Sequence, residues 1–343
     1  MQRYLTINEL SIMRRKVLAV LLVVCSLLVS CKLKLKDVDT SGQSIKVEVS
    51  RYDKLLYDYV MVNNFASMQK MTEEYSQETR LLVEEVLSIG QVNDEDMNVR
   101  LREYYSDSTL VKIMRDTQVR FANLEWLNKD LTHAFRNLSN MLPELTVPRF
   151  YTQMSALNES IIIGDSVVGI SLDKYLGSDY SIYKRYYYSY QMRSMNPSRI
   201  VPDCLFFYLL SKYPVPDEVR ALSDFMVHFG KINYICARAM NYSLTKRQIG
   251  FSEEAQKWCA QNEKRVWNTL VEKGLLDVKD PMVVREYMIP SEFSPLFGES
   301  SSDQLGIWLG ARMIDEYMSK HPTYTVKELL AVPARKILSE ARF

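Results

Sequence analysis

The stretch Ile161-Ile162-Ile163-Gly164-Asp165-Ser166-Val167-Val168-Gly169-Ile170 decides the fold class. Two β-branched runs flank a Gly-Asp pair, which is the pattern of a tight β-hairpin. Upstream, residues 147–155 are also typical of a strand, and residues 45–49 alternate apolar and polar side chains as a half-buried strand does. These segments together predict one small β-sheet.

Helical patterns cover much of the remaining sequence. Only 11 glycines occur in 343 residues, which favours helices with short connections over a many-turned β-sandwich. The first expected helix spans residues 66–90 and is closed by Gly90, and the next begins at a cap, Asp107 or Ser108, and continues with one break to Pro143. Helix is expected again from Pro202 onward, with a long segment Pro216–Met240, and a further helix begins at a cap, Ser252. The last two expected helices run from Asp303 through Met318 and, after Pro322, from a cap at Thr325. We therefore predict an α+β fold, mainly α-helical with a small β-sheet, in a single domain over residues 45–343.

Two of these helices carry glycine in their interiors. Gly230 lies within Pro216–Met240, and Gly306 and Gly310 share one face of the segment 306–318. A glycine inside a helix costs about 1 kcal/mol relative to alanine, so it usually has a packing or functional reason. We expect these two helices to pack against each other in one core.

The charge and the cysteines argue against several classes of protein. A formal net charge of +1 provides no general attraction for nucleic acid. Cys204, Cys236 and Cys259 have no CxxC spacing, so a cysteine metal site is not expected. Three such residues form at most one disulfide among themselves, and we interpret them as small buried hydrophobic residues.

Residues suited to catalysis or metal binding are sparse. The three histidines are His133, His228 and His321, and no HExxH, GxSxG, GxGxxG or GxxxxGKS/T motif occurs. His228 lies on the apolar face of an expected helix, where we favour a satisfied core histidine over a catalytic one. We therefore predict no catalytic residue, no metal site and no cofactor.

The order of the elements resembles that of zincin metallopeptidases, in which an edge hairpin precedes a long buried helix that carries HExxH. The corresponding helix here reads Val227-His228-Phe229-Gly230-Lys231-Ile232-Asn233-Tyr234. It keeps one histidine, and Phe229 or Lys231 stands where the motif has the glutamate that activates zinc-bound water. This layout predicts a degenerate zincin-like metallopeptidase scaffold with an inactive site.

The N-terminal segment is typical of a bacterial lipoprotein precursor. Three basic residues, 14–16, precede an apolar run, Val17–Val29, that is too short for a comfortable permanent membrane span. The run ends Leu28-Val29-Ser30-Cys31, which resembles a lipobox with its aliphatic residue, small residue and acceptor cysteine. We predict a signal peptide over residues 1–30, lipidation of Cys31 with diacylglyceryl and palmitate groups, and a tether over residues 31–44. A plain signal anchor is the alternative, and Met13 is a second candidate start beside Met1.

The segment 180–190 is rich in tyrosine and includes Tyr186-Tyr187-Tyr188. Such rings are able to stack on sugars or to contact a protein partner. Amphipathic packing with a solvated hydroxyl group is the commoner role for tyrosine, and we favour it here.

Several segments spread over most of the mature chain match the pattern of one family. They are residues 47–56 (VEVSRYDKLL), 225–231 (FMVHFGK), 250–254 (GFSEE) with Trp258-Cys259 and Asn262-Glu263, 267–273, and 306–318. Together they resemble the GldB family of gliding-motility lipoproteins from the Bacteroidetes, with Tyr52 where that family usually has phenylalanine. The resemblance implies a membrane-anchored cell-envelope protein linked to gliding and to type IX secretion, with no established enzymatic activity.

These observations lead to three hypotheses of function. We expect a non-catalytic lipoprotein, anchored by its lipid to the outer membrane, that acts through contacts with unidentified envelope proteins. The alternative is a lipoprotein that binds glycan or peptidoglycan through Tyr186, Tyr187 and Tyr188. A hydrolase that uses His228 with carboxylates from elsewhere is the third hypothesis. The membrane and envelope proteins are the expected partners, and nucleic acid is not.

Overall fold

The structure, a computed structural model, describes residues 45–294, 296–299 and 301–341. These residues belong to one unit of the chain. The expected signal peptide over residues 1–30, the lipidation site Cys31 and the tether over residues 31–44 lie outside the described residues. The three predictions for that part of the chain therefore stay predictions.

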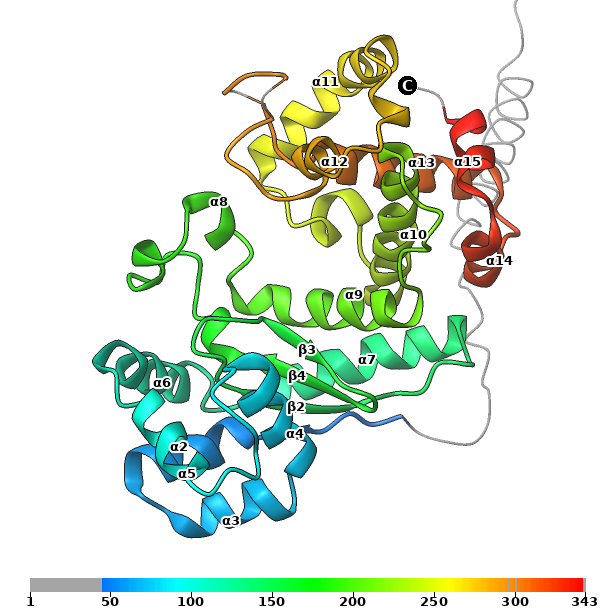
Figure 1. Ribbon diagram of the computed structural model, residues 1–343. Coiled ribbons are helices and arrows are strands. Elements are labelled where there is room, and N and C mark those ends of the chain that lie inside the picture. The colour runs from blue at the N-terminus through cyan, green and yellow to red at the C-terminus, as the bar shows by residue number, and fades with distance from the viewer. Residues whose placement is uncertain (1–44, 295, 300, 342–343) are drawn as a thin grey trace, which may run out of the picture. The chain divides into compact units, whose positions relative to one another are not determined.

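Four strands form a small mixed sheet in the order β1-β2-β4-β3 (Figure 1). They are β1 (Val49–Ser50), β2 (Arg149–Gln153), β3 (Ile161–Ile163) and β4 (Val167–Ser171). Strands β1, β2 and β4 run parallel, while β3 and β4 form the expected antiparallel hairpin with Ile162 opposite Gly169. The prediction of an α+β fold that is mainly helical with a small sheet is confirmed.

Helices come before and after the three strands β2 to β4 (Figure 1). The α-helices before them are α2 (Tyr52–Val62), α3 (Phe65–Glu73), α4 (Ser76–Arg80), α5 (Met97–Tyr104), α6 (Ser108–Arg120) and α7 (Glu125–Met141). Those after them are α8 (Ser189–Met192), α9 (Ile200–Lys212), α10 (Leu222–Met240), α11 (Glu253–Glu272), α12 (Pro281–Met288), α13 (Leu305–Lys320), α14 (Val326–Ala331) and α15 (Ala334–Glu340). Shorter segments are the π-helices η1 (Leu81–Val86) and η5 (Leu244–Gln248) and the 3-10 helices η2 (Leu172–Lys174), η3 (Tyr183–Arg185), η4 (Pro197–Arg199) and η6 (Leu275–Asp277).

Successive side chains of β2 and β4 enter two different cores, as the two-residue period of a strand requires. Phe150 and Val168 pack in a first core with α7, α9 and α10. Tyr151 and Val167 pack in a second core with α2, α3, α5 and α6. Helices thus cover both faces of the sheet, which explains why β4 is buried along its whole length.

Helix α10 joins the first core to a third core that it forms with α11, α12 and α13. Its residues Ile232 and Cys236 pack in the first core, and Met226 packs in the third. At the crossing of α10 and α13, a Cβ atom on Gly310 would lie 2.0 Å from the Met226 carbonyl oxygen, and a Cβ atom on Gly230 would lie 2.5 Å from the Gly310 carbonyl oxygen. The predicted packing of these two helices is confirmed, and only glycine permits so close an approach.

The expected strand over residues 45–49 is wrong for most of its length, because β1 has only two residues. The alternation itself has a structural cause, since Val47 and Val49 are both buried. However, the backbone N–H of Val47 donates to Thr132 Oγ1 and that of Val49 donates to Asn128 Oδ1. Side chains of α7 therefore take the place of a neighbouring strand as hydrogen-bond partners.

The single helix expected over residues 66–90 is wrong as well, because the structure has three segments there. Helix α3 ends where the Lys70 carbonyl oxygen accepts two successive backbone N–H groups. Helix α4 then begins and runs directly into η1. Ser88 adopts a left-handed conformation with φ of +50°, so Gly90 lies beyond the last helical residue and is not its C-cap.

Two helices start later than the sequence indicated. The N–H of Val219 donates to the carbonyl oxygen of Pro216 over 2.9 Å, so this segment is a turn and α10 begins after it. Helix α13 begins after Asp303, which was expected to open it. The carboxylate of Asp303 instead accepts from the guanidinium of Arg193 and from the backbone N–H of Ser291. A long-range ion pair has replaced the expected local cap.

Candidate functional site

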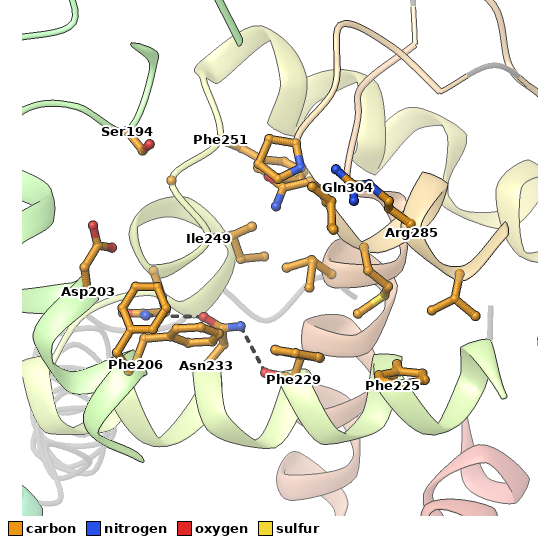
Figure 2. A pocket seen from close by; sticks show the side chains of 18 of the residues that line it. Ser194, Asp203, Phe206, Phe225, Phe229, Asn233, Ile249, Phe251, Arg285 and Gln304 are labelled. Atoms are coloured by element: carbon orange, nitrogen blue, oxygen red, sulfur yellow. Dashed lines mark hydrogen bonds between the residues drawn. The ribbon is translucent and has the colours of Figure 1, made fainter. Parts of the chain in front are cut away.

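A cavity of about 830 Å³ opens between α9, α10, η5 and α12 (Figure 2). Its lining residues range in sequence from Ser160 to Ile307, so it exists only in the folded chain. Most of the lining is apolar, and the apolar side chains are Phe206, Phe207, Val219, Phe225, Phe229, Ile249, Phe251, Pro281, Val284, Met288, Ile289, Pro290 and Ile307. A concave apolar site of this size is typical of a ligand-binding pocket.

Aromatic rings form the wall along α10. Phe225 and Phe229 are four residues apart and therefore lie on the same helix face. The ring of Phe206, from α9, stacks on Phe229 with the ring centroids 6.0 Å apart and an angle of 20° between the planes. Phe251 stacks in the same way on Trp308 of α13, at 6.0 Å and 15°. These contacts hold three of the wall rings, Phe206, Phe229 and Phe251, in place before any ligand arrives.

Two amide side chains on the wall are bonded within the protein (Figure 2). The Nδ2 group of Asn233 donates to the carbonyl oxygen of Phe229 over 2.9 Å. Its Oδ1 atom accepts from Gln248 Nε2 over 3.3 Å, and the hydroxyl of Tyr242 donates to Gln248 Oε1 over 2.8 Å. The buried amides of Asn233 and Gln248 therefore use much of their hydrogen-bonding capacity on groups within the protein.

The acidic group of the cavity is also paired. Asp203, the one carboxylate among the described lining residues, accepts from Arg199 Nη2 over 2.9 Å and from the hydroxyl of Tyr175 over 3.0 Å. Burial raises the pKa of Asp203, and the charge of Arg199 opposes that rise. Arg199 also donates to the carbonyl oxygens of Arg247 and Gln248. Both oxygens of the carboxylate are therefore occupied, as a structural ion pair requires.

Basic side chains lie at the opening of the cavity. Arg220, Lys279 and Arg285 line it and are exposed, and none of them forms an ion pair with a described residue. We call these three residues the mouth cations. Arg193 also lines the cavity, but its charge is compensated by Asp303 at 2.7 Å. The opening therefore carries an excess of positive charge.

The histidine of the hydrolase hypothesis lies elsewhere, because His228 does not line the cavity. Its Nε2 atom is buried and has no hydrogen-bond partner among the described residues. Burial lowers the pKa of His228, the nearby charge of Lys231 lowers it further, and a backbone hydrogen bond with Tyr213 opposes the change. No hydrogen bond links its ring to a carboxylate within the described ranges. The expectation of a satisfied core histidine is therefore wrong in part, because His228 is only half-buried and its Nε2 atom has no partner among the described residues.

The tyrosines of segment 180–190 divide between packing and exposure. Tyr183 is buried and donates its hydroxyl to the carbonyl oxygen of Asp173, and Tyr187 is half-buried beside Lys174. Tyr186 and Tyr188 are exposed. Packing therefore explains some of these rings and leaves two available for contacts with a partner.

A second candidate surface lies on the N-terminal helices, far from the cavity in sequence. Val62, Phe65 and Val99 are exposed by 66%, 66% and 56%, and we call them the Phe65 surface. Phe65 and Val99 also line a hollow of about 620 Å³ together with Arg102. Single exposed apolar residues are normal, but Phe65 and Val99 border one hollow, and such a grouping indicates an interaction site.

The sequence did not predict either the cavity or the Phe65 surface. The helical spacing of Phe225 and Phe229 is typical of a buried helix face, although both residues are only half-buried. Adjacent aromatic residues such as Phe206 and Phe207 point to different sides of a helix, so one buried face does not cover both rings. This pattern is the feature of the sequence that indicates an exposed aromatic surface. The partners across the cavity are too distant in sequence for any local pattern to reveal them.

The structure also bears on metals and membranes. Within the described ranges, no group of three or more histidine, cysteine, aspartate or glutamate residues is placed to hold a metal ion. Cys204, Cys236 and Cys259 are buried as free thiols, as expected. None of the described helices combines the length and the hydropathy needed to cross a bilayer.

Comparison with known proteins gives a family match. A family model described as gliding motility protein GldB matches residues 34–343, which include every described residue. No curated protein matches the chain, and no solved structure matches it. The degenerate zincin-like scaffold therefore stays a prediction.

Proposed function

The chain belongs to the gliding motility protein GldB family, and on this premise we propose that it is a non-catalytic, lipid-anchored protein that acts through contacts with other envelope proteins. Lipid on Cys31 would hold it at a membrane, and we propose that this is the outer membrane. The described residues would then meet their partners on the aqueous side.

The Phe65 surface is the observation that carries the proposal of protein contacts. Phe65 is the first residue of α3, and the side chain of Asn64 accepts hydrogen bonds from the N–H groups of the next residues, Ala66 and Ser67. The ring of Phe65 also packs edge-on against the ring of Tyr59, with the ring centroids 6.4 Å apart. A large apolar ring that is fixed in position yet exposed to water is suited to anchor a protein interface.

A non-catalytic role is supported by the chemistry of the cavity. Asp203 is held by Arg199 and Tyr175, and the amides of Asn233 and Gln248 are bonded to each other. A general base must lie within hydrogen-bond reach of the proton that it removes, and a nucleophile needs such a base beside it. Arg199 and Tyr175 compete with any substrate for the two oxygens of Asp203. The described lining is better suited to binding than to covalent chemistry.

The proposal is tested by crosslinking in intact cells of the native host. Cells that carry the wild type, Phe65→Asp or Val119→Asp are crosslinked, their membranes are then isolated, and the captured proteins are identified and quantified. Val119 on α6 is 80% exposed and lies outside the Phe65 surface, so it is the matched control. We expect Phe65→Asp to lose specific envelope proteins that the wild type and Val119→Asp both retain.

Equal abundance and equal melting temperature of the three proteins would show that the loss is not a folding defect. If the double variant Phe65→Asp/Val99→Asp still captured the same proteins in the same amounts, the proposed contact surface would be wrong.

Binding of glycan or peptidoglycan is the second candidate, and the exposure of Tyr186 and Tyr188 favours it. Sedimentation with purified peptidoglycan tests this role directly. The hypothesis requires that the wild type co-sediments and that Tyr186→Ala/Tyr188→Ala does not. A wild-type chain that stays in the supernatant would exclude it.

A further inference from the structure

We propose that the cavity between α9, α10, η5 and α12 binds an acyl chain that carries an anionic head group. The apolar wall would take the chain, and the mouth cations would take the head group. The inference is independent of the protein contacts proposed above, because the cavity and the Phe65 surface share no residue.

The buried lining of the cavity is mostly apolar, and its two amides, Asn233 and Gln248, are bonded to each other, while the exposed lining includes three cations. Phe251, Val284 and Met288 line it and are buried, whereas the mouth cations that line it are exposed. A ligand that fits this division has a long apolar part and a charge at one end. Its apolar part would leave water on binding, which is the driving force for association with such a wall.

The hydrogen bonds of the wall favour an acyl chain over a peptide or a sugar. Asn233 and Gln248 are bonded to each other and to neighbouring groups, so they are poor partners for new polar atoms. Each peptide residue brings an N–H and a C=O group, and a sugar brings several hydroxyl groups, all of which are costly to bury without partners. An acyl chain brings none along its length.

The charges at the opening favour an anionic head group. Asp203 is the one carboxylate among the described lining residues and is compensated by Arg199, so it does not offset the mouth cations. In Figure 2, Gln304 and Arg285 lie on the side of the cavity away from Asp203. Arginine, lysine and an amide N–H group are all donors to carboxylate and phosphate oxygens. The shared chemistry is therefore that of a fatty acid or of an acidic lipid with one chain.

The test measures displacement of a fluorescent fatty acid, 11-(dansylamino)undecanoic acid, from the full chain carrying Cys31→Ala, which has no lipid on that residue. The competitors are palmitate, lysophosphatidylglycerol, uncharged hexadecanol and a peptide of alternating glutamate and leucine. We expect saturable binding of the probe and displacement by palmitate, by lysophosphatidylglycerol or by both. Palmitate alone would identify a free fatty acid as the source, and lysophosphatidylglycerol alone would identify a phospholipid.

Charge reversal at the opening locates the site. Lys279→Glu/Arg285→Glu should weaken binding of the anionic competitor about tenfold or more, and it should leave the melting temperature unchanged because both residues are exposed. The matched control is Lys257→Glu/Lys264→Glu, which reverses two exposed charges on α11 outside the cavity and should bind as the wild type does.

Three outcomes would overturn the inference. They are the absence of probe binding, equal binding by the charge-reversed variant and its control, and stronger displacement by the peptide than by either acyl anion.

Discussion

At the scale of single residues, Lys231 is a lysine in an apolar setting. It is 8% exposed, and its Nζ atom donates to the carbonyl oxygens of Leu330 and Val332. These bonds connect the C-terminal end of α14 to α10. Burial lowers the pKa of Lys231 to about 8, and no carboxylate forms an ion pair with it within the described ranges.

The lowered pKa predicts that stability rises with pH. An unfolded lysine has a pKa of about 10.4, so between pH 8 and that value the unfolded chain binds more protons than the folded chain, and the free energy of unfolding increases with pH. Lys231→Met removes this titration. The stability difference between wild type and variant should therefore shift in favour of the wild type by roughly 2 kcal/mol from pH 7 to pH 9.5.

Urea unfolding of both proteins at the two pH values measures that shift. The control variant Lys257→Met changes an exposed lysine and should show no such shift. A difference that is equal at both pH values would mean that Lys231 is not titrating in this range.

Single residues also show which structural details the sequence was able to predict. Asp107 accepts from the N–H groups of α6, Ser252 from the N–H of Ala255, and Thr325 forms a reciprocal capping box with Glu328. These caps depend on neighbours within a few residues, so a local pattern finds them. Asp303 has the same composition signal, but its partner Arg193 is distant in sequence, and the predicted cap was wrong.

At the scale of elements, the crossing of α10 and α13 is limited by backbone atoms. A Cβ atom on Gly310 would meet the Met226 carbonyl oxygen, whereas a Cβ atom on Gly306 would lie 2.5 Å from the side-chain sulfur of Met288 and 3.0 Å from the Tyr287 carbonyl oxygen. Side chains adjust to an added methyl group, but a backbone carbonyl moves only if its helix moves. The two glycines therefore differ although both lie on one helix face.

This difference predicts graded effects of alanine. Gly310→Ala should lower the free energy of unfolding by about 3 kcal/mol or more, because overpacking outweighs the gain of about 1 kcal/mol in helix propensity. Gly306→Ala should cost roughly 1 kcal/mol or less for the same reasons. Chemical denaturation of the wild type and the two variants gives the order directly, and the reverse order would contradict the described crossing.

Elements also mark the limit of prediction from sequence. The hairpin and the glycine-bearing helices were recognised because hydrophobic periodicity and glycine spacing act along one element. The strand over residues 45–49 was not correct, since its alternating burial is real but its hydrogen-bond partners are side chains of α7. Periodicity reports which face is buried and does not report what covers it.

At the scale of the whole molecule, the attachment to a membrane is the first prediction. Cys31→Ala removes the proposed lipid acceptor, so the variant should leave the detergent-rich phase in Triton X-114 partitioning, in which the wild type should be retained. The matched control is Cys25→Ala, which changes the other cysteine of the N-terminal segment and should partition as the wild type does. Equal retention of a processed Cys31→Ala protein would contradict lipidation at this residue.

The second prediction for the whole molecule concerns zinc. His133 on α7, His228 on α10 and His321 after α13 belong to different elements, and the described residues hold no group of three potential ligands. Structural zinc usually has four such ligands and catalytic zinc three. Elemental analysis of the purified chain, dialysed after addition of zinc, should find well below one zinc per chain. One tightly held zinc ion per chain would disprove this expectation.

The three buried thiols allow the opening of two cores of this protein to be measured by chemical labelling. Cys204 and Cys236 lie in the first core and Cys259 in the third, and burial raises the pKa of each. A buried thiol with a raised pKa is inert, so an alkylating reagent reaches it only during transient opening of the surrounding core. Because α10 contributes residues to both cores, we expect them to open cooperatively, with Cys204 and Cys259 becoming labelled at the same denaturant concentration.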